Sequence, residues 1–285
     1  MDTQTVNPAE KAAREAYEKV ETALKAYLTD EMVGSTILAD AMRYALLDGK
    51  VRFRASLVLG FCRLFGGRDE AALPYACALE CAAAASLIHG DLPAVNDMEL
   101  RGGRPTCVTK FGEAETIFAG DSLTALAFEI AASNQYVSHK SVRLAVSTLS
   151  KEIGALGLTG SYITERYGTL SGYGDLRKFY LRKSATLIRA ACLLGYYAAA
   201  DKTTPKDIAN VKLYAEAVAL AAQIHDDILG TDPAGGRTNV LTYLKPNEAE
   251  EEEALLTLLA IEAISDYPGS ELLCKQAIWL LSRQK

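Results

Sequence analysis

Apolar residues recur three or four positions apart along almost the whole chain, which is the spacing that places them on one face of an α-helix. Alternation of apolar and polar residues, the pattern of a half-buried strand, is scarce. Brief runs of Gly, Pro, Asp and Asn interrupt the periodicity and predict the helix ends. The chain is therefore expected to be all-α, with helices over residues 8–29, 33–48, 51–65, 70–89, 111–133, 138–156, 161–167, 175–199, 205–230, 247–265 and 269–283.

The chain is long enough and apolar enough to bury one large core. It has 285 residues, of which 49% are hydrophobic, and no linker or low-complexity segment divides it. We therefore predict one domain over residues 1–285, with residues 1–8 as a flexible tail.

Charge and hydropathy argue against several kinds of partner. The 36 acidic residues exceed the 30 basic ones, so nucleic acid is not expected as a partner. No apolar run is expected to span a membrane, and the charged N-terminus is typical of neither a secretory signal nor an anchor. Six cysteines without a CxxC pair favour buried, reduced thiols. These features predict a soluble, cytoplasmic protein.

Two acidic segments each end a long apolar helix. The first contains Asp91 and is followed by two arginines, and the second, AAQIHDDILG, contains Asp226 and Asp227. Carboxylates among apolar residues are costly to bury unless they are paired or bound to a cation. Acids can hold divalent cations through their oxygens, and arginines can hold phosphate oxygens. We therefore expect both segments to face one cavity, with Asp226 as a metal ligand or a member of an ion pair.

These segments belong to a set of motifs that resembles the trans-isoprenyl diphosphate synthases, the polyprenyl synthetase family that includes farnesyl and geranylgeranyl diphosphate synthases. The resemblance runs from about Ala41 to Tyr243, through VRFRASLVLGFCRLFGG, ACALE, SLIHGDLP, ELRGGRPT, FGEAETIFAGDSLTALAFE, RKSATLIRAA and QIHDDILG. It implies a single isoprenoid synthase-like helical bundle around a deep central cavity, with two aspartate segments facing each other across its mouth. It also implies a dimer, an allylic prenyl diphosphate as substrate and Mg2+ as cofactor.

The reaction of that family assigns a role to each kind of residue. Carboxylates hold Mg2+ against the allylic diphosphate, which leaves as an allylic cation forms, and the double bond of isopentenyl diphosphate then attacks the cation. The resemblance implies that the catalytic residues are Asp91, Asp226, Asp227 and Lys183, and that the three aspartates are also the metal ligands. The substrate-binding residues that it implies are Arg54, Arg101, Gln223, Arg237, Ala85 and Ser86.

The first aspartate segment departs from the family pattern. Gly90 stands at the first of the paired aspartates, and Asn96 stands at the distal aspartate. Asp97 is not expected to replace position 96, because a shift of one residue along a helix turns the side chain by roughly 100°. Two expected metal ligands are therefore missing.

The site for isopentenyl diphosphate departs further. Val51 stands at the family's lysine, Ala83 at its helix histidine, and Gly102 at the second of its paired arginines. Each lost charge-assisted contact weakens binding by about 1.5–3 kcal/mol. Normal condensation with isopentenyl diphosphate is therefore expected to be impaired. Tyr162 also stands where the family has a glutamine.

Three interpretations remain open. The chain is an enzyme that acts on an allylic prenyl diphosphate with reduced Mg2+ occupancy, by prenyl transfer or by ionisation and cyclisation. Alternatively, it is a catalytically silent subunit or regulator of an active prenyl diphosphate synthase, so that the partner is a second copy or an active synthase. The third is a binder of prenyl lipids. The small residues 82–86 predict room for a chain longer than farnesyl, unless Phe118 closes the cavity.

Overall fold

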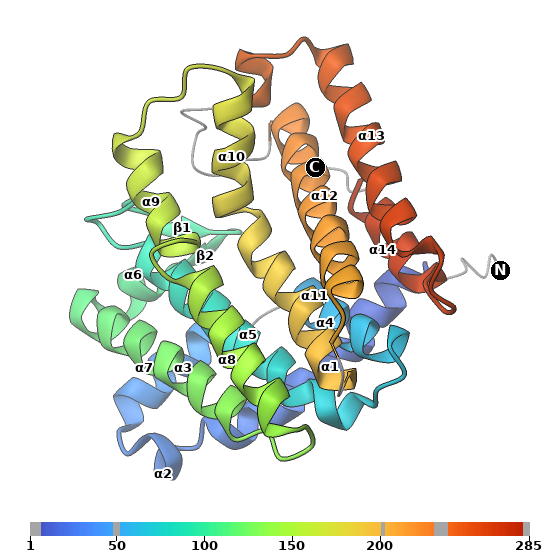
Figure 1. Ribbon diagram of the computed structural model, residues 1–285. Coiled ribbons are helices and arrows are strands. Elements are labelled where there is room, and N and C mark those ends of the chain that lie inside the picture. The colour runs from blue at the N-terminus through green and yellow to red at the C-terminus, as the bar shows by residue number, and fades with distance from the viewer. Residues whose placement is uncertain (1–6, 48–51, 201–202, 231–238, 282–285) are drawn as a thin grey trace, which may run out of the picture.

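The computed structural model describes residues 7–47, 52–200, 203–230 and 239–281, and these residues are helical almost throughout (Figure 1). The predicted all-α fold is confirmed. The helices are α1 (Pro8–Tyr27), α2 (Asp30–Val33), α3 (Thr36–Leu46), α4 (Phe53–Leu64), α5 (Asp69–Gly90), α6 (Cys107–Phe111), α7 (Glu113–Ala132), α8 (His139–Ile153), α9 (Leu158–Tyr167), α10 (Tyr173–Lys183), α11 (Ala185–Ala199), α12 (Pro205–Leu229), α13 (Pro246–Ser265) and α14 (Glu271–Leu281). The described residues also contain one short antiparallel hairpin, formed by β1 (Leu100–Arg101) and β2 (Arg104–Pro105).

Local sequence signals set the helix ends. α12 begins at Pro205, and the side chain of Thr204 accepts a hydrogen bond from the backbone N–H of Asp207, which satisfies one of the unpaired donors of the first turn. The same helix ends at Gly230, whose φ of 63° is the left-handed conformation that glycine adopts without strain. The second acidic segment therefore occupies the last turn of a well-bounded helix.

The helix α5 lies in the core of the bundle (Figure 1). Its alanines let neighbouring helices approach closely. The contact with α7 is also close: a Cβ atom added at Gly120 of α7 would lie 2.0 Å from Nε2 of His89 on α5. α5 is also apolar and long enough to cross a membrane by length and composition alone, contrary to the expectation that no apolar run qualifies. Because 78% of that apolar window is buried inside the protein, the helix fits a core position.

One predicted helix is in fact two. The periodicity predicted a single helix over 175–199, but the chain turns at Ser184, between α10 and α11. The Ser184 hydroxyl donates a hydrogen bond of 2.6 Å to Oε1 of Gln223 on α12. Apolar spacing alone does not reveal the break, since that contact comes from a distant part of the chain. The β1–β2 hairpin was also not predicted.

A buried arginine ties three helices together beside the candidate site. Arg52 precedes α4 and is 3% exposed. Its guanidinium donates to Glu21 of α1 at 2.7 Å, to Glu80 of α5 at 3.0 Å and to the carbonyl of Leu46 in α3 at 2.7 Å. The charge therefore has two carboxylate partners, which fixes the start of α4 relative to α5.

Candidate functional site

A pocket of about 640 Å3 opens between α3, α4, α5 and the β1–β2 hairpin. Alanines 83 and 84 of α5 form part of its apolar wall. Its charged lining consists of four arginines and two acids: Arg52, Arg54, Arg101, Arg104, Glu80 and Asp91. We call it the arginine pocket. Such a concentration of guanidinium groups favours an anion, although Arg52 is paired with Glu21 and Glu80 and Arg101 with Asp91.

The hairpin supplies two of these arginines. Gly102 and Gly103 both have positive φ, at 57° and 77°, which is the backbone of a two-residue type I′ turn. The turn pairs Arg101 directly with Arg104 across the hairpin. Arg104 therefore stands on the pocket wall although Gly102 replaces the second of the paired arginines. The Arg-Gly-Gly-Arg sequence was the signal for this arrangement, and the sequence prediction missed it.

Arg104 is held against an aromatic ring. Its guanidinium carbon lies 3.7 Å from the ring centroid of Tyr44, and the Tyr44 hydroxyl donates to the carbonyl of Pro105 at 2.7 Å. This contact with the ring helps to hold the guanidinium on the pocket wall.

Arg54 and Arg52 each keep one buried donor without a hydrogen-bond partner among the described residues. The donor is Nε in both side chains. The Arg54 guanidinium is 39% exposed, and its Nη2 atom lies 3.8 Å from Oε2 of Glu80. A buried N–H group without an acceptor is costly, so an anion in the pocket would supply the missing acceptor for Arg54.

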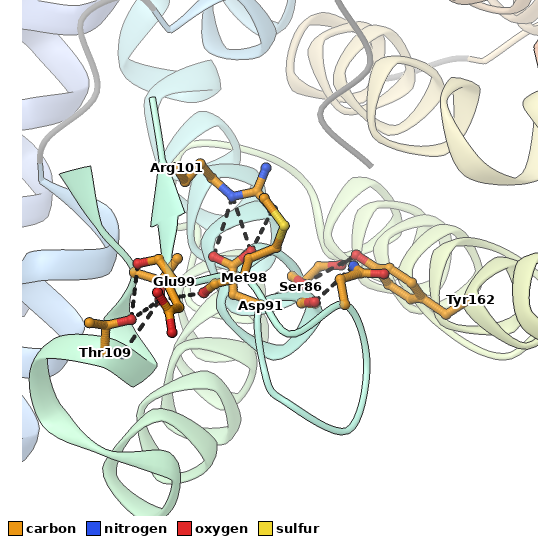
Figure 2. Close-up of polar contacts among 10 residues, drawn as sticks. Ser86, Asp91, Met98, Glu99, Arg101, Thr109 and Tyr162 are labelled. Carbon is orange, nitrogen blue, oxygen red and sulfur yellow. Dashed lines mark hydrogen bonds and ion pairs between the residues drawn. The ribbon is translucent and has the colours of Figure 1, made fainter. Parts of the chain in front are cut away.

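In the first aspartate segment, Asp91 pairs with Arg101 (Figure 2). Asp91 is 2% exposed and accepts from Nη2 of Arg101 at 2.5 Å and from Nε at 3.1 Å. This bidentate pair satisfies a buried carboxylate within the chain. Two residues that were predicted to bind metal and substrate separately are therefore bonded to each other.

The rest of this segment presents no carboxylate at the family's ligand positions. The amide of Asn96 donates to the carbonyl of Gly90 at 2.8 Å. Asp97 is exposed and has a φ of 52°, which orients it differently from a helical residue. The helical rotation on which the expectation for Asp97 rested does not apply, because α5 ends at Gly90 and residues 91–98 are not helical.

In the second aspartate segment, Asp227 is buried and bonded within the chain. It is 2% exposed and accepts from the hydroxyl of Tyr180, from the amide of Gln223 at 3.1 Å and from the backbone N–H of Val240 at 2.8 Å. These three donors hold the Asp227 carboxylate within the chain. Asp226 is half-buried on the same turn of α12.

His225, the neighbour of Asp226, faces α13. Its Nδ1 lies 3.2 Å from Oε1 of Glu253, and both side chains are nearly buried. Burial raises the pKa of Glu253 and the adjacent His225 lowers it, with burial the larger effect. The pair joins α12 to α13 behind the aspartates.

The remaining predicted residues fall into three places. Nζ of Lys183 pairs with Glu165 of α9 at 2.5 Å. Ala85 lies in the core, and Ser86 faces the hydroxyl of Tyr162. Arg237 lies outside the described residues.

The described acids do not fit the paired, two-sided metal site that the resemblance implies. Within 7–47, 52–200, 203–230 and 239–281, no group of three or more His, Cys, Asp or Glu side chains is placed to hold a metal ion. Two of the three predicted ligands, Asp91 and Asp227, are buried and already accept several hydrogen bonds. Phe118 is 62% exposed on α7 and does not line the arginine pocket.

Comparisons with known proteins give a consistent picture. A sequence profile described as Polyprenyl synthetase matches residues 35–275. Geranylgeranyl pyrophosphate synthase 11, chloroplastic, of Arabidopsis thaliana is 38% identical over 199 residues, covering 67% of this chain and 55% of that protein. The large subunit 1 of the heterodimeric geranylgeranyl pyrophosphate synthase, chloroplastic, of the same plant is 37% identical over 198 residues, covering 67% of this chain and 53% of that protein. The chain thus matches about half the length of these relatives.

Solved structures extend the similarity to nearly the whole chain. The apo crystal structure of an FPP/GFPP synthase from Zymomonas mobilis superposes with a TM-score of 0.88 at 26% identity, covering 95% of this chain and 98% of that one. A putative farnesyl-diphosphate synthase from Marinomonas gives a TM-score of 0.84 at 28% identity, covering 95% of this chain and 98% of that one.

Proposed function

Because the chain belongs to the polyprenyl synthetase family, we propose that it binds an isoprenoid diphosphate and that its condensation with isopentenyl diphosphate is impaired. The observation that carries this proposal is the arginine pocket. Four guanidinium groups line it, and the buried Nε of Arg54 has no acceptor among the described residues, so a diphosphate oxygen would supply one. The apolar wall beside these charges suits the hydrocarbon part of the same ligand.

Synthesis requires more than diphosphate binding. The prenyl diphosphate synthases generally use Mg2+, which neutralises the leaving diphosphate when bound. In this chain, Asp226 and Asp227 are the acids proposed to hold it, and Asp91 is the third. We propose reduced Mg2+ occupancy, since Asp91 is committed to Arg101 and Asp227 to three donors of the chain. Chain elongation by the isolated protein is then slow.

Inorganic pyrophosphate is the simplest probe of the arginine pocket. Titrated calorimetrically into the full chain, it is expected to bind, and Arg54→Ala is expected to raise Kd by about 10- to 100-fold. The reason is that a charge-assisted hydrogen bond contributes about 1.5–3 kcal/mol, and about 1.4 kcal/mol is a tenfold change in Kd.

Arg14→Ala is the matched control for that titration. Arg14 lies on α1, away from the pocket, in an exposed ion pair with Glu10. Its removal should leave the Kd for pyrophosphate unchanged. Equal Kd values for the wild type and Arg54→Ala would contradict the proposal that diphosphate binds in this pocket.

A second candidate function is that of a subunit or regulator that pairs with an active prenyl diphosphate synthase. The specific observation is that two adjacent apolar side chains of α7 face solvent: Ile117 is 40% exposed and Phe118 is 62% exposed. Adjacent exposed apolar side chains are typical of an interaction surface. A relative whose name marks it as the large subunit of a heterodimeric synthase makes an active synthase a reasonable partner.

Phe118→Glu tests this surface. A buried glutamate at an apolar interface costs several kcal/mol, so association with a coexpressed synthase of the family should weaken by at least about 100-fold. Light scattering after size exclusion measures the mass, with and without the synthase. Leu255→Glu on α13, at a side chain that is 62% exposed, is the control for a general loss of solubility. If Phe118→Glu associates with the synthase as strongly as the wild type does, α7 is not part of the interface.

A further inference from the structure

The end of α5 contacts α9 where Gly90 meets Tyr162. The Tyr162 hydroxyl lies 3.3 Å from both the hydroxyl and the carbonyl oxygen of Ser86 (Figure 2). A Cβ atom added at Gly90 would lie 2.9 Å from that hydroxyl oxygen. At this distance the Tyr162 side chain would have to shift to admit a Cβ atom, so Tyr162 occupies the space that a side chain at position 90 would need.

The segment that follows Gly90 is held by groups of the chain itself. Asn96 donates to the carbonyl of Gly90 at 2.8 Å, and Arg166 of α9 donates to the carbonyl of Ala94 at 2.5 Å. At the other end, Arg101 pairs with Asp91. Residues 90–101 are therefore fixed from α9 on one side and from the hairpin on the other.

We infer that residues 90–101 form a cation-independent clamp in which Tyr162 and Gly90 are a matched pair. Side-chain hydrogen bonds and one ion pair hold residues 90–101 in place, a role that metal coordination would otherwise have. The inference concerns how this segment is held, and it stands whether or not the arginine pocket binds a diphosphate. It also predicts that a side chain at Gly90 is tolerated better when the Tyr162 hydroxyl is removed.

A double-mutant cycle between the two positions tests the pairing. Gly90→Ala adds one methyl group, and Tyr162→Phe removes only the hydroxyl that this methyl would meet. The nearest ring carbons lie 3.5 Å and 3.6 Å from the added Cβ, which is ordinary contact. We expect Gly90→Ala to lower Tm by about 2–4 °C in the wild type, and to leave Tm unchanged or raise it in the Tyr162→Phe background.

Gly174→Ala is the matched control for this cycle. Gly174 is also helical, on α10, and an added Cβ there would have no atom within 4 Å. Its effect on Tm should be the same in both backgrounds. If Gly90→Ala also has the same effect in both backgrounds, the matched pair is refuted.

Metal dependence tests the other half of the inference. Asn96→Ala removes the bond to the Gly90 carbonyl, and it should lower Tm equally in EDTA and in Mg2+. By contrast, the triple variant Gly90→Asp, Asn96→Asp, Tyr162→Gln should gain a rise in Tm on adding Mg2+ that exceeds any rise in the wild type. A loss in Asn96→Ala that Mg2+ reverses would show that the segment depends on a cation, and would overturn the inference. No diphosphate is present in these measurements, so they are independent of the pyrophosphate titration.

Discussion

Replacing Arg52 with Met is expected to lower the free energy of unfolding by about 3–5 kcal/mol, the cost of removing one partner from a buried ion pair. Arg52 is 3% exposed, and its removal leaves Glu21 and Glu80, both nearly buried, without their cation. Burial lowers the pKa of Arg52 and the two carboxylates raise it, with a net rise, so the guanidinium stays charged. The Arg54 guanidinium lies 3.8 Å from the Glu80 carboxylate and is 39% exposed, so it compensates only part of the lost charge. Among the described residues, Arg52 is the only cation in an ion pair with Glu21.

Urea denaturation followed by circular dichroism measures the effect. Arg14→Met is the matched control, because the Arg14–Glu10 pair is an exposed i,i+4 contact that is expected to contribute less than about 1 kcal/mol. The carboxylates of Glu21 and Glu80 can also be removed. The triple variant Arg52→Met, Glu21→Gln, Glu80→Gln should recover part of the loss, since it leaves no buried charge unpaired. A loss in Arg52→Met as small as that in Arg14→Met would show that the cluster is hydrated.

Periodicity predicts the helices of this fold because each of them buries one apolar face, and the predicted ranges agree with the described ones to within a few residues for most helices. It misses the short helices α2 and α6, and it fails at Ser184 and at the hairpin for different reasons. At Ser184 the break accompanies a hydrogen bond to Gln223, which is 39 residues away. At the hairpin the signal is local, in Gly102 and Gly103, but it is too short for a periodicity to detect.

The candidate site was predictable in its residue types and less so in its pairings. Asp91, Arg101 and Arg54 do line one pocket. That Asp91 is bonded to Arg101 depends on the loop between them, which turns back so that the backbone N–H of Met98 donates to the carbonyl of Asp91 at 3.1 Å. Likewise, the space at Gly90 is set by Tyr162, which is 72 residues away in the sequence. Contacts of this kind follow from packing and leave no mark in local composition.

Assayed alone with Mg2+, the protein is expected to elongate geranyl, farnesyl or geranylgeranyl diphosphate with isopentenyl diphosphate at least about 100-fold more slowly than an intact synthase of the family. Each lost charge-assisted contact costs about 1.5–3 kcal/mol, or roughly 10- to 100-fold. The positions that have lost a charged or metal-binding group are Gly90, Asn96, Val51 and Ala83. Any residual release of diphosphate is expected not to require isopentenyl diphosphate, since only the allylic substrate then needs to be bound.

Asp226→Ala is expected to abolish that residual release. Asp226 is the half-buried acid of the second aspartate segment, beside Asp227, whose carboxylate is already satisfied by three donors. Asp97→Asn is the matched control, because Asp97 is an exposed acid of the first segment and asparagine tolerates its positive φ. Diphosphate release, followed with and without isopentenyl diphosphate, separates the outcomes. Full release of diphosphate by Asp226→Ala would exclude this carboxylate as a metal ligand. If the wild type releases no diphosphate, the second candidate function, a subunit that pairs with an active synthase, is favoured. Rapid elongation by the isolated wild type would contradict the proposed impairment, because it would require both diphosphates to be bound and neutralised at a site whose described acids are largely committed to other partners.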